Sequence, residues 1–345
     1  MTKKKTEALL QIEKLKTYFF TDEGTVKAVD GIDLSIFPRK TLGLVGESGC
    51  GKTVTALSIM GLLPPYGRVV EGRILFEGRD LRRLKERELN KVRGKEIGMV
   101  FQEPMTSLNP IFTVGHQIEE AIIFHQERNK KEARQIALDM LKKVELPSPE
   151  EQLNEYPHQL SGGMKQRVMI AMALSCGPKL LIADEPATAL DVTIQREILE
   201  LLLRLQNEYN MSILLITHDL GVVNLVAERI AVMYASKIAE YATRDEIFSN
   251  PKHPYTIGLL NSIPKIGEKR KSLQAIPGQP PDPLAPIEGC RFHPRCFFAT
   301  KKCIEKEPVL EEISPDHKTA CWRHSIVDKQ SWLEYSKRGN KNAIM

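Results

Sequence analysis

The sequence predicts an α/β fold built around a parallel sheet with helices on its faces. Three observations lead to this prediction. Short apolar strands alternate with helical segments between residues 97 and 216, an alternation typical of parallel sheets. An apolar strand at 41–45 leads directly into a glycine-rich turn and a helical segment at 54–62. Residues 8–45 alternate between apolar and polar in the manner of antiparallel strands, which adds a second, antiparallel sheet.

Composition excludes several classes of protein. The chain has 345 residues, enough for one large or two modest domains, and its net charge of +5 demands no nucleic acid. Its longest apolar runs are far shorter than the roughly 18 residues that span a bilayer. The basic N-terminus is followed by no apolar stretch, so we expect no signal peptide. We therefore expect a cytosolic protein that reaches a membrane only by docking to another protein.

Residues 46–53 read G-x-x-x-x-G-K-T, the pattern of a phosphate-binding loop. Glycines let backbone N–H groups curl around an anion, and the helix N-terminus that follows adds partial positive charge. Lys52 supplies a mobile cation for the outer phosphates of a nucleoside triphosphate, and the Thr53 hydroxyl is placed to bind Mg²⁺. The alternative is a glycine-rich turn that binds no ligand. The match to all eight positions of the pattern disfavours this alternative. The residues expected to contact the nucleotide here are Ser48, Gly49, Cys50, Gly51, Lys52, Thr53 and Val54.

A second acidic element follows an apolar strand at 180–183. A carboxylate at the end of a buried strand can lie beside a metal, so Asp184 is predicted to hold Mg²⁺. Glu185, the next residue, is the candidate to polarise the attacking water. A polar strand end without function is the alternative.

Residues 160–167 read LSGGMKQR, in which Ser161, Gly162 and Gly163 precede a helix and form a further anion site. This string resembles the signature of ABC-type ATPases. The resemblance implies that the site crosses a dimer interface and closes on the γ-phosphate held by the opposite subunit. It also implies a RecA-like P-loop ATPase core with an antiparallel β subdomain and an inserted α-helical subdomain. Without the resemblance, Ser161 would be read as a helix cap.

The other motifs of the family match in order between about residues 8 and 262. Gln102 matches the glutamine that ligates Mg²⁺ and senses the membrane partner. His218 matches the switch histidine, which contacts the γ-phosphate and positions water. Phe19 matches the aromatic that stacks on adenine, with Tyr18 as the runner-up because a one-residue register change flips strand faces. The catalytic residues that the resemblance implies are Lys52, Glu185 and His218.

The composition shifts after about residue 263. A proline-rich stretch at 276–286 and the strings NPKHPYT at 250–256 and GCRFHPRC at 289–296 resemble the C-terminal extension of oligopeptide/dipeptide importer ATPases. We expect an ABC ATPase domain over 1–262, with its helical subdomain at about 103–165. We expect a C-terminal extension over 263–345 that ends in a disordered tail.

This second resemblance implies a subunit that hydrolyses ATP to power uptake of di- or oligopeptides at the cytoplasmic face of the membrane. The implied partners are a second homologous ATPase (or a homodimer in isolation), two transmembrane permease subunits and, indirectly, an extracytoplasmic binding protein. Nickel importers share the extension, so an importer of nickel or another small solute is an alternative. A soluble ABC ATPase is another, but only a short stretch without a long coiled coil separates Gln102 from Ser161.

Four of the six cysteines crowd the last sixth of the chain. In a reducing cytosol such clustering suggests a metal centre before disulfides. Four thiolates can hold zinc or a [4Fe–4S] cluster. Because importer ATPases with this cysteine set resemble iron–sulfur binders, we expect a [4Fe–4S] cluster, with zinc or unligated thiols as alternatives. The expected ligands are Cys290, Cys296, Cys303 and Cys321.

Overall fold

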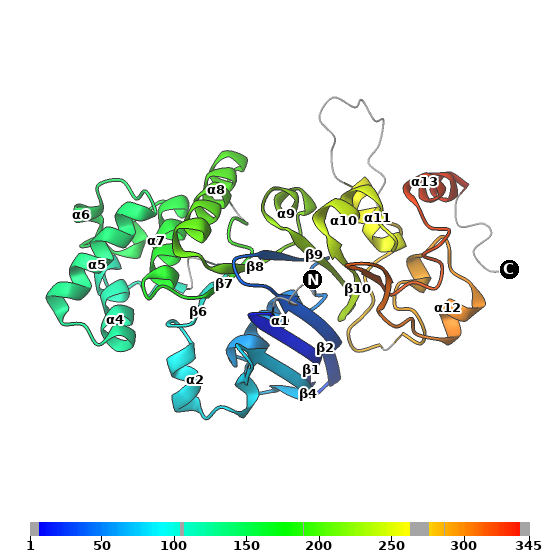
Figure 1. Ribbon diagram of the computed structural model, residues 1–345, viewed down its shortest axis with the longest axis horizontal. Helices are drawn as coiled ribbons and strands as arrows, with labels where there is room; N and C mark the ends of the chain where they lie inside the picture. The colour runs from blue at the N-terminus through cyan, green and yellow to red at the C-terminus, as the bar shows by residue number, and fades with distance from the viewer. Residues whose placement is uncertain (1–6, 104–106, 189, 263–275, 286, 339–345) are drawn as a thin grey trace, which may run out of the picture. The chain divides into compact units, whose positions relative to one another are not determined.

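The computed structural model describes residues 7–103, 107–188, 190–262, 276–285 and 287–338. The chain divides into two compact units, and each is described by itself (Figure 1). The helical unit contains Ile36–Thr41 and Asp80–Ile216. The phosphate-loop unit contains Leu10–Ser35, Leu42–Arg79 and the chain from Thr217 onward.

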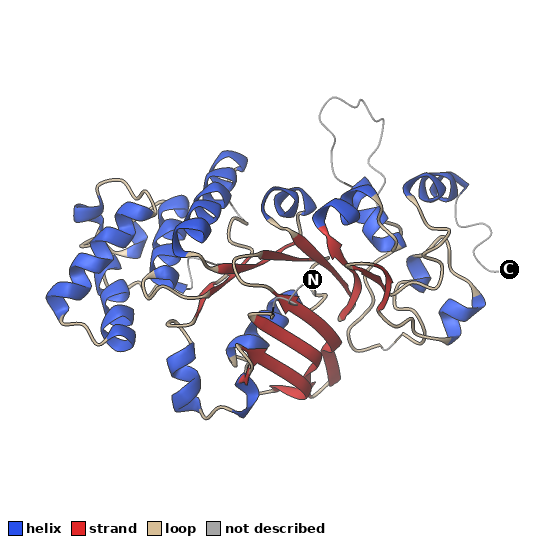
Figure 2. Cartoon of the chain, viewed as in Figure 1, coloured by secondary structure: helices blue, strands red, loops and turns tan. Residues whose placement is uncertain are grey.

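The helical unit is built on three parallel strands. They are β6 (Ile97–Val100), β7 (Leu180–Asp184) and β8 (Ser212–Thr217), paired in the order β6-β7-β8. Every residue of β7 and β8 is buried, as expected for strands covered on both faces. The α-helices are α2 (Glu86–Val92), α4 (Val114–Gln126), α5 (Lys130–Lys143), α6 (Pro149–Gln152), α7 (Gly162–Leu174) and α8 (Val192–Tyr209), with short 3₁₀ turns η1 (Leu81–Arg83) and η2 (Pro157–Gln159). The predicted parallel sheet with covering helices is confirmed (Figure 2).

Local sequence accounts for the main helices of this unit. Asn129 caps α5 by accepting a hydrogen bond from the Glu132 N–H, and the Glu132 carboxylate accepts one from the Asn129 N–H. This reciprocal capping box satisfies two N–H groups that the helix itself cannot bond. Asp191 caps α8 by accepting hydrogen bonds from the N–H groups of Thr193 and Ile194.

The phosphate-loop unit contains two sets of strands. The first set, in the order β2-β1-β4-β5, comprises β1 (Leu10–Thr21), β2 (Gly24–Ile36), β4 (Gly67–Phe76) and β5 (Arg79–Asp80). The second set, in the order β3-β9-β10-β12-β11, comprises β3 (Thr41–Val45), β9 (Arg229–Tyr234), β10 (Lys237–Thr243), β12 (His317–Thr319) and β11 (Glu311–Ser314). Its helices are α1 (Lys52–Met60), α9 (Leu220–Val226), α10 (Arg244–Ser249), α11 (Pro254–Asn261), α12 (Lys301–Glu305) and α13 (Lys329–Arg338), with the 3₁₀ turn η3 (His293–Arg295). The predicted antiparallel sheet is confirmed, since β1 pairs with β4 in opposite directions.

One strand is longer than its glycines suggest. Glycines at 67, 72 and 78 are typical of turns between strands, but β4 runs continuously through Gly72. The φ of Gly72 is +96°, and a Cβ there would lie 2.6 Å from the carbonyl oxygen of Glu13. The register of β1 against β4 shifts at this point. Gly72 therefore marks a bulge where two backbones approach closely, and not a turn.

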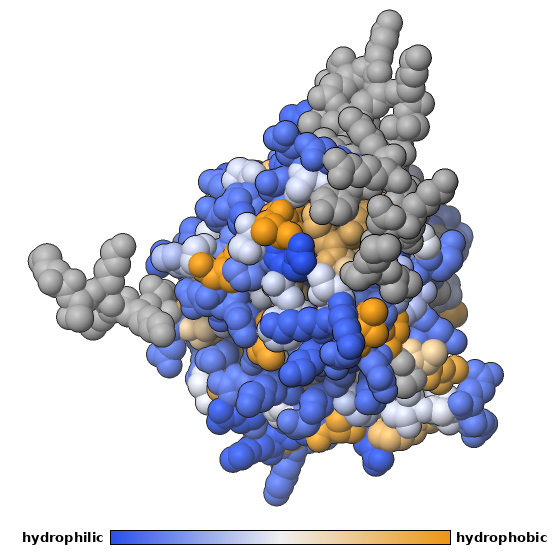
Figure 3. Space-filling model, turned by 90° about the vertical axis from the view of Figure 1, so that its right-hand side faces the viewer, coloured by the Kyte–Doolittle hydropathy of each residue, from blue (hydrophilic) through white to orange (hydrophobic). Residues whose placement is uncertain are grey.

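The C-terminal extension continues the second set of strands. β12 pairs with β10 through Glu240 and Thr319, so residues on both sides of the expected boundary at 262 share one sheet. Trp332 of α13 is buried with Ile257 and Phe298. The domain boundary at 262 stays a prediction, and most of the expected disordered tail lies outside the described residues. The face that Figure 3 shows is mostly hydrophilic, with apolar side chains in small groups.

No helix in the described part of the chain has both the length and the apolar character needed to cross a membrane.

Candidate functional site

The phosphate loop joins β3 to α1. Its Gly51 is the N-cap of α1 with a φ of +109°, and a Cβ there would lie 2.2 Å from the carbonyl oxygen of Ala28. Gly49 also has a positive φ, +78°, but the space around it is open. Only glycine adopts such backbone conformations without strain. The sequence pattern thus reflects a turn that other residues cannot make.

Lys52 is folded back onto this loop. Its ammonium donates hydrogen bonds to the carbonyl oxygens of Gly46, at 2.8 Å, and of Glu47, at 3.0 Å. Only 5% of Lys52 is exposed. The carbonyl oxygens of the loop therefore hold the Lys52 ammonium beside the loop, where the phosphate oxygens of a nucleotide would compete with them for its hydrogen bonds.

The remaining loop residues divide by burial. Ser48 and Gly49 are exposed, and Thr53 and Val54 are half-buried. The Cys50 side chain is buried, and burial raises the pKa of its thiol to about 11, which keeps it neutral. Its side chain therefore offers no charge to a nucleotide.

The acidic element lies in the helical unit at the end of β7. Asp184 is buried, while Glu185 takes a φ of +47° and donates its N–H to the Ile216 carbonyl at 2.8 Å. The Glu185 carboxylate accepts hydrogen bonds from the Thr188 hydroxyl, at 2.9 Å, and from the Gln102 amide, at 3.3 Å. A non-glycine residue in the left-handed region is uncommon, and such residues gather at functional sites. The structure thus brings together two predicted site residues, Gln102 and Glu185.

The signature residues begin α7 in the same unit. Ser161 caps the helix, with its hydroxyl accepting from the Met164 N–H at 3.3 Å. Ser161 and Gly162 are exposed. The helix cap read from the sequence is therefore real, and the exposed helix start leaves this position accessible to an anion from outside.

Phe19 and Tyr18 point to opposite faces of β1. The Tyr18 hydroxyl donates to an Asp30 carboxylate oxygen at 2.8 Å, and burial together with this bond raises the pKa of Tyr18 to about 12. Phe19 is half-buried beside Tyr66, with 5.6 Å between ring centroids. Since Tyr18 is committed to Asp30, Phe19 is the better of the two candidates for stacking on a base.

The predicted residues are divided between the two units. The phosphate loop, Phe19 and the exposed His218 belong to the phosphate-loop unit. Gln102, the acidic pair at 184–185 and the signature at 161–163 belong to the helical unit. The donor types fit Mg²⁺, which prefers hydroxyl, amide and carboxylate oxygens. The individual roles of these residues stay predictions.

The four C-terminal cysteines line one cavity of only about 10 Å³, together with Phe292 and Phe298. Burial raises the pKa of Cys290 to about 11, of Cys321 to about 12, and of Cys296 well above its usual value. All four are free thiols. Within the described ranges, no group of three or more His, Cys, Asp or Glu residues is placed to hold a metal ion.

The prediction of a [4Fe–4S] cluster at Cys290, Cys296, Cys303 and Cys321 is therefore wrong, and zinc finds no ligand set there. Cys303 is buried and the other three are half-buried, and a buried cysteine behaves as a small apolar group. Spacing along the chain could not reveal this burial.

Sequence reasoning missed two residues that bond to the phosphate loop. The Arg295 guanidinium bonds to the Glu47 carboxylate, and the Tyr255 hydroxyl accepts from the Glu47 N–H at 2.9 Å. Arg295 and Glu47 are 248 positions apart. No local pattern connects them, so only the folded chain reveals the contact.

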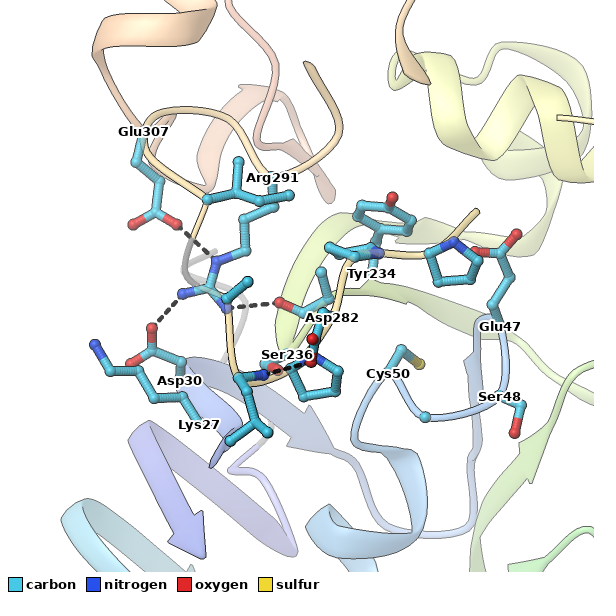
Figure 4. Close-up of a pocket in the computed structure, with 18 of the residues that line it drawn as sticks. Lys27, Asp30, Glu47, Ser48, Cys50, Tyr234, Ser236, Asp282, Arg291 and Glu307 are labelled. Carbon is cyan, nitrogen blue, oxygen red and sulfur yellow. Dashed lines mark hydrogen bonds and ion pairs between the residues drawn. The ribbon is translucent and has the colours of Figure 1, made fainter. Parts of the chain in front are cut away.

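A cavity of about 600 Å³ borders the exposed side of the loop (Figure 4). Its walls come from the loop residues 47–50, from β2, from the turn after β9 and from the proline-rich residues 280–285. Asp282 holds a turn in the proline-rich wall, since its carboxylate accepts from the Leu284 N–H at 2.9 Å. The C-terminal extension thus lies directly beside the phosphate loop.

Two family models match the chain. Residues 29–188 match the ABC transporter model, and residues 239–303 match the model of the oligopeptide/dipeptide transporter C-terminal region.

Several curated proteins are similar over nearly their whole length. The chain is 51% identical to the dipeptide transport ATP-binding protein DppD of Bacillus subtilis, covering 92% of this chain and 95% of the relative. It is 54% identical to the oligopeptide transport ATP-binding protein AppD of the same organism, covering 88% and 92%. It is 48% identical to DppD of Escherichia coli, covering 91% and 96%.

Among solved structures, the chain resembles the dimeric ATP-binding cassette MJ0796 bound to ADP and Pi. The TM-score is 0.62 at 30% identity, and the match covers 68% of this chain and 98% of the other. The predicted cassette fold is confirmed.

Proposed function

This chain belongs to the ABC transporter family of ATPases, and we propose that it is the ATP-hydrolysing subunit of an importer of di- or oligopeptides. The observation that carries the proposal is similarity over nearly the full length of dipeptide and oligopeptide transport ATP-binding proteins. The match to the oligopeptide/dipeptide transporter C-terminal region adds support outside the ATPase domain.

Phosphoryl transfer to water depends mostly on positioning and on stabilising charge. The N–H groups of the phosphate loop cradle the phosphates, and Lys52 leaves its loop carbonyls to neutralise the outer ones. Thr53, Gln102 and Asp184 would hold Mg²⁺, which would offset charge that develops on the phosphate oxygens. Phe19 stacks on adenine.

Glu185 polarises the attacking water. Hydrogen bonds from Thr188 and Gln102 orient its carboxylate. The carboxylate group that accepts a proton from water is therefore already oriented before the nucleotide binds. His218 helps to orient the water against the γ-phosphate. Gln102 passes the state of a membrane partner to Glu185, and its hydrogen bond to the Glu185 carboxylate supports this role.

The exposed start of α7, with Ser161, Gly162 and Gly163, completes the site of a second ATPase subunit. Two such subunits close on two nucleotides and work with two permease subunits at the cytoplasmic face of the membrane. An extracytoplasmic binding protein delivers the peptide to the permeases.

Reconstitution tests this function. The chain, its second ATPase subunit and its permeases are placed in vesicles with the binding protein, and uptake of labelled dipeptide and phosphate release are measured together. We expect uptake that requires ATP and Mg²⁺ and that stimulates phosphate release. Uptake of labelled Ni²⁺ in place of peptide would contradict the peptide assignment, and absence of any ATP-dependent uptake would contradict the transport role.

A further inference from the structure

Glu47 is the second residue of the phosphate loop, and hydrogen bonds with three side chains hold it in place. Its backbone N–H donates to the Tyr255 hydroxyl at 2.9 Å, and its backbone carbonyl accepts from Lys52 at 3.0 Å. Its carboxylate accepts two hydrogen bonds from Arg295, at 2.7 and 3.0 Å. Two parallel bonds between a guanidinium and a carboxylate fix direction as well as distance.

Arg295 comes from η3 in the C-terminal extension and is only 7% exposed. Besides the two bonds to Glu47, its guanidinium donates to the Pro277 carbonyl at 2.8 Å and to the Tyr234 hydroxyl at 3.3 Å. Burial alone lowers the pKa of Arg295, but its hydrogen bonds to Glu47 and Tyr234 outweigh burial, so the pKa lies above its usual value. Arg295 is thus a permanent cation with nearly every donor engaged.

The surroundings of this ion pair are closely packed. Tyr234 of β9 packs on Tyr255 of α11 with 4.5 Å between ring centroids, and Phe292 completes an aromatic cluster with both. A Cβ on Gly46 would lie 2.1 Å from the Met233 carbonyl oxygen, so the start of the loop sits directly on β9. The aromatic cluster thus packs beside Arg295 and the start of the loop and supports the position of both.

A carboxylate in a phosphate-binding loop creates an electrostatic problem. A nucleoside triphosphate brings several negative charges to the loop, and Glu47 would repel them. With a side chain only 25% exposed, Glu47 has limited screening by water. A fixed guanidinium at 2.7 Å neutralises that charge and stops the carboxylate from turning toward the phosphates.

We propose that Arg295 is a positioning residue of the phosphate loop, which acts through Glu47 and makes ATP binding depend on the C-terminal extension. This inference rests on the proposed ATPase function. Arg295 touches neither the nucleotide nor the reacting atoms. It neutralises Glu47 and holds the loop backbone in the shape that receives phosphate. The extension is thereby part of the nucleotide-binding apparatus of the same chain.

Binding of a fluorescent ATP analogue to the full chain tests the proposal. We expect Arg295→Gln to weaken binding by about ten- to a hundredfold, since it leaves an unpaired carboxylate in a displaced loop. Adding Glu47→Gln to Arg295→Gln removes that carboxylate, so the double variant binds the analogue more tightly than Arg295→Gln alone. Arg295→Lys keeps the charge but not the fork, and is expected to fall between Arg295→Gln and the unsubstituted protein.

Arg229→Gln is the matched control. Arg229, the first residue of β9, pairs with a carboxylate of the extension, Asp316, at 2.7 Å, and its backbone lies opposite Leu42, before the loop begins. We expect its loss to leave the Kd of the analogue unchanged. Steady-state kinetics add a second readout: Arg295→Gln raises KM for ATP far more than it lowers kcat, because the residue acts on the loop and not on the attacking water.

The outcomes separate this inference from the function it rests on. Failure of the unsubstituted protein to bind the analogue would remove the proposed ATPase function itself. Normal binding by the unsubstituted protein together with equal binding by Arg295→Gln would overturn only the role of Arg295. If Arg295→Gln does not fold, the Arg295→Lys variant decides: an unchanged Kd in that variant contradicts the requirement for a two-bond fork.

Discussion

Gln102 and Glu185, which lie 83 positions apart, are joined by a hydrogen bond of 3.3 Å from the Gln102 amide to a Glu185 carboxylate oxygen. The contact follows from strand order. β6 and β7 are parallel neighbours, with Val100 opposite Ala183, so the residues just beyond their carboxyl ends meet at one edge of the sheet. Thr188 donates to the same oxygen at 2.9 Å, so the carboxylate is held from two sides.

Replacing Glu185 with glutamine should abolish hydrolysis but not nucleotide binding. The amide has the shape of the carboxylate but cannot accept a proton from water, and loss of a general base costs about 10²- to 10⁴-fold in rate. We expect phosphate release to fall by at least about a hundredfold, and an ATP-bound dimer to accumulate in size-exclusion chromatography. Ordinary steady-state turnover by Glu185→Gln would contradict the role of Glu185.

Replacing Lys52 with alanine should abolish ATP binding. The Lys52 ammonium donates hydrogen bonds to the carbonyl oxygens of Gly46 and Glu47. When ATP binds, its phosphate oxygens take the place of these carbonyl oxygens as partners of the ammonium. Loss of those bonds also costs about 1 kcal/mol of folding stability. Isothermal titration with ATP checks the first effect and urea unfolding the second. Binding that survives in Lys52→Ala would remove this residue from the site.

Two glycines of the loop give a matched pair. Gly51→Ala places a Cβ 2.2 Å from the Ala28 carbonyl oxygen at a φ of +109°, so the loop must shift. Gly49→Ala meets only the unfavourable φ of +78°, a cost of about 1–2 kcal/mol, because nothing lies within 4 Å. We therefore expect Gly51→Ala to weaken ATP binding far more than Gly49→Ala. Equal ATP affinities in the two variants would mean that close packing around Gly51 does not shape the loop.

Local contacts are what the sequence predicted well. The strand, turn and helix of the phosphate loop and the buried strand that ends in Asp184 depend on residues within a few positions of one another. Periodicity and capping rules describe such contacts directly. The remaining site residues, Gln102, His218 and Phe19, were predicted because the family's motifs match this sequence in the same order.

Long-range contacts could not be predicted. Gly72 looked like a turn because the cause of its bulge, the close backbone of Glu13, lies in another strand. No sequence pattern around Arg295 or around Glu47 indicates that the two side chains pair. The clustered cysteines suggested a metal because spacing along the chain does not report where side chains lie in the fold, and no group of three or more His, Cys, Asp or Glu in the described residues is placed to hold a metal ion.

ATP hydrolysis by this chain should depend on its concentration. The signature residues Ser161 and Gly162 are exposed at the start of α7, where the proposed function requires a second subunit to use them. We expect phosphate release per chain to rise with protein concentration and to vanish in samples that remain monomeric during the assay. Rapid turnover by a strictly monomeric sample would contradict the shared site.

His253 should make folding stability depend on pH. It is buried, and burial lowers its pKa to about 3, while its Nδ1 caps α11 by accepting from the Tyr255 N–H at 3.1 Å. The unfolded chain binds a proton near the ordinary value of 6.5, which the folded chain excludes. The contribution is therefore fully present above pH 6.5 and is lost as the pH falls toward 3.

Each pH unit in that window costs about 1.4 kcal/mol of unfolding free energy, so about 2–3 kcal/mol is lost between pH 6.5 and about pH 4.5. His253→Asn keeps a side-chain oxygen that can cap α11 but cannot titrate. Urea unfolding at both pH values should give a smaller loss for His253→Asn than for the unsubstituted chain. The same pH dependence in both proteins would show that other groups, and not His253, set the acid sensitivity of this fold.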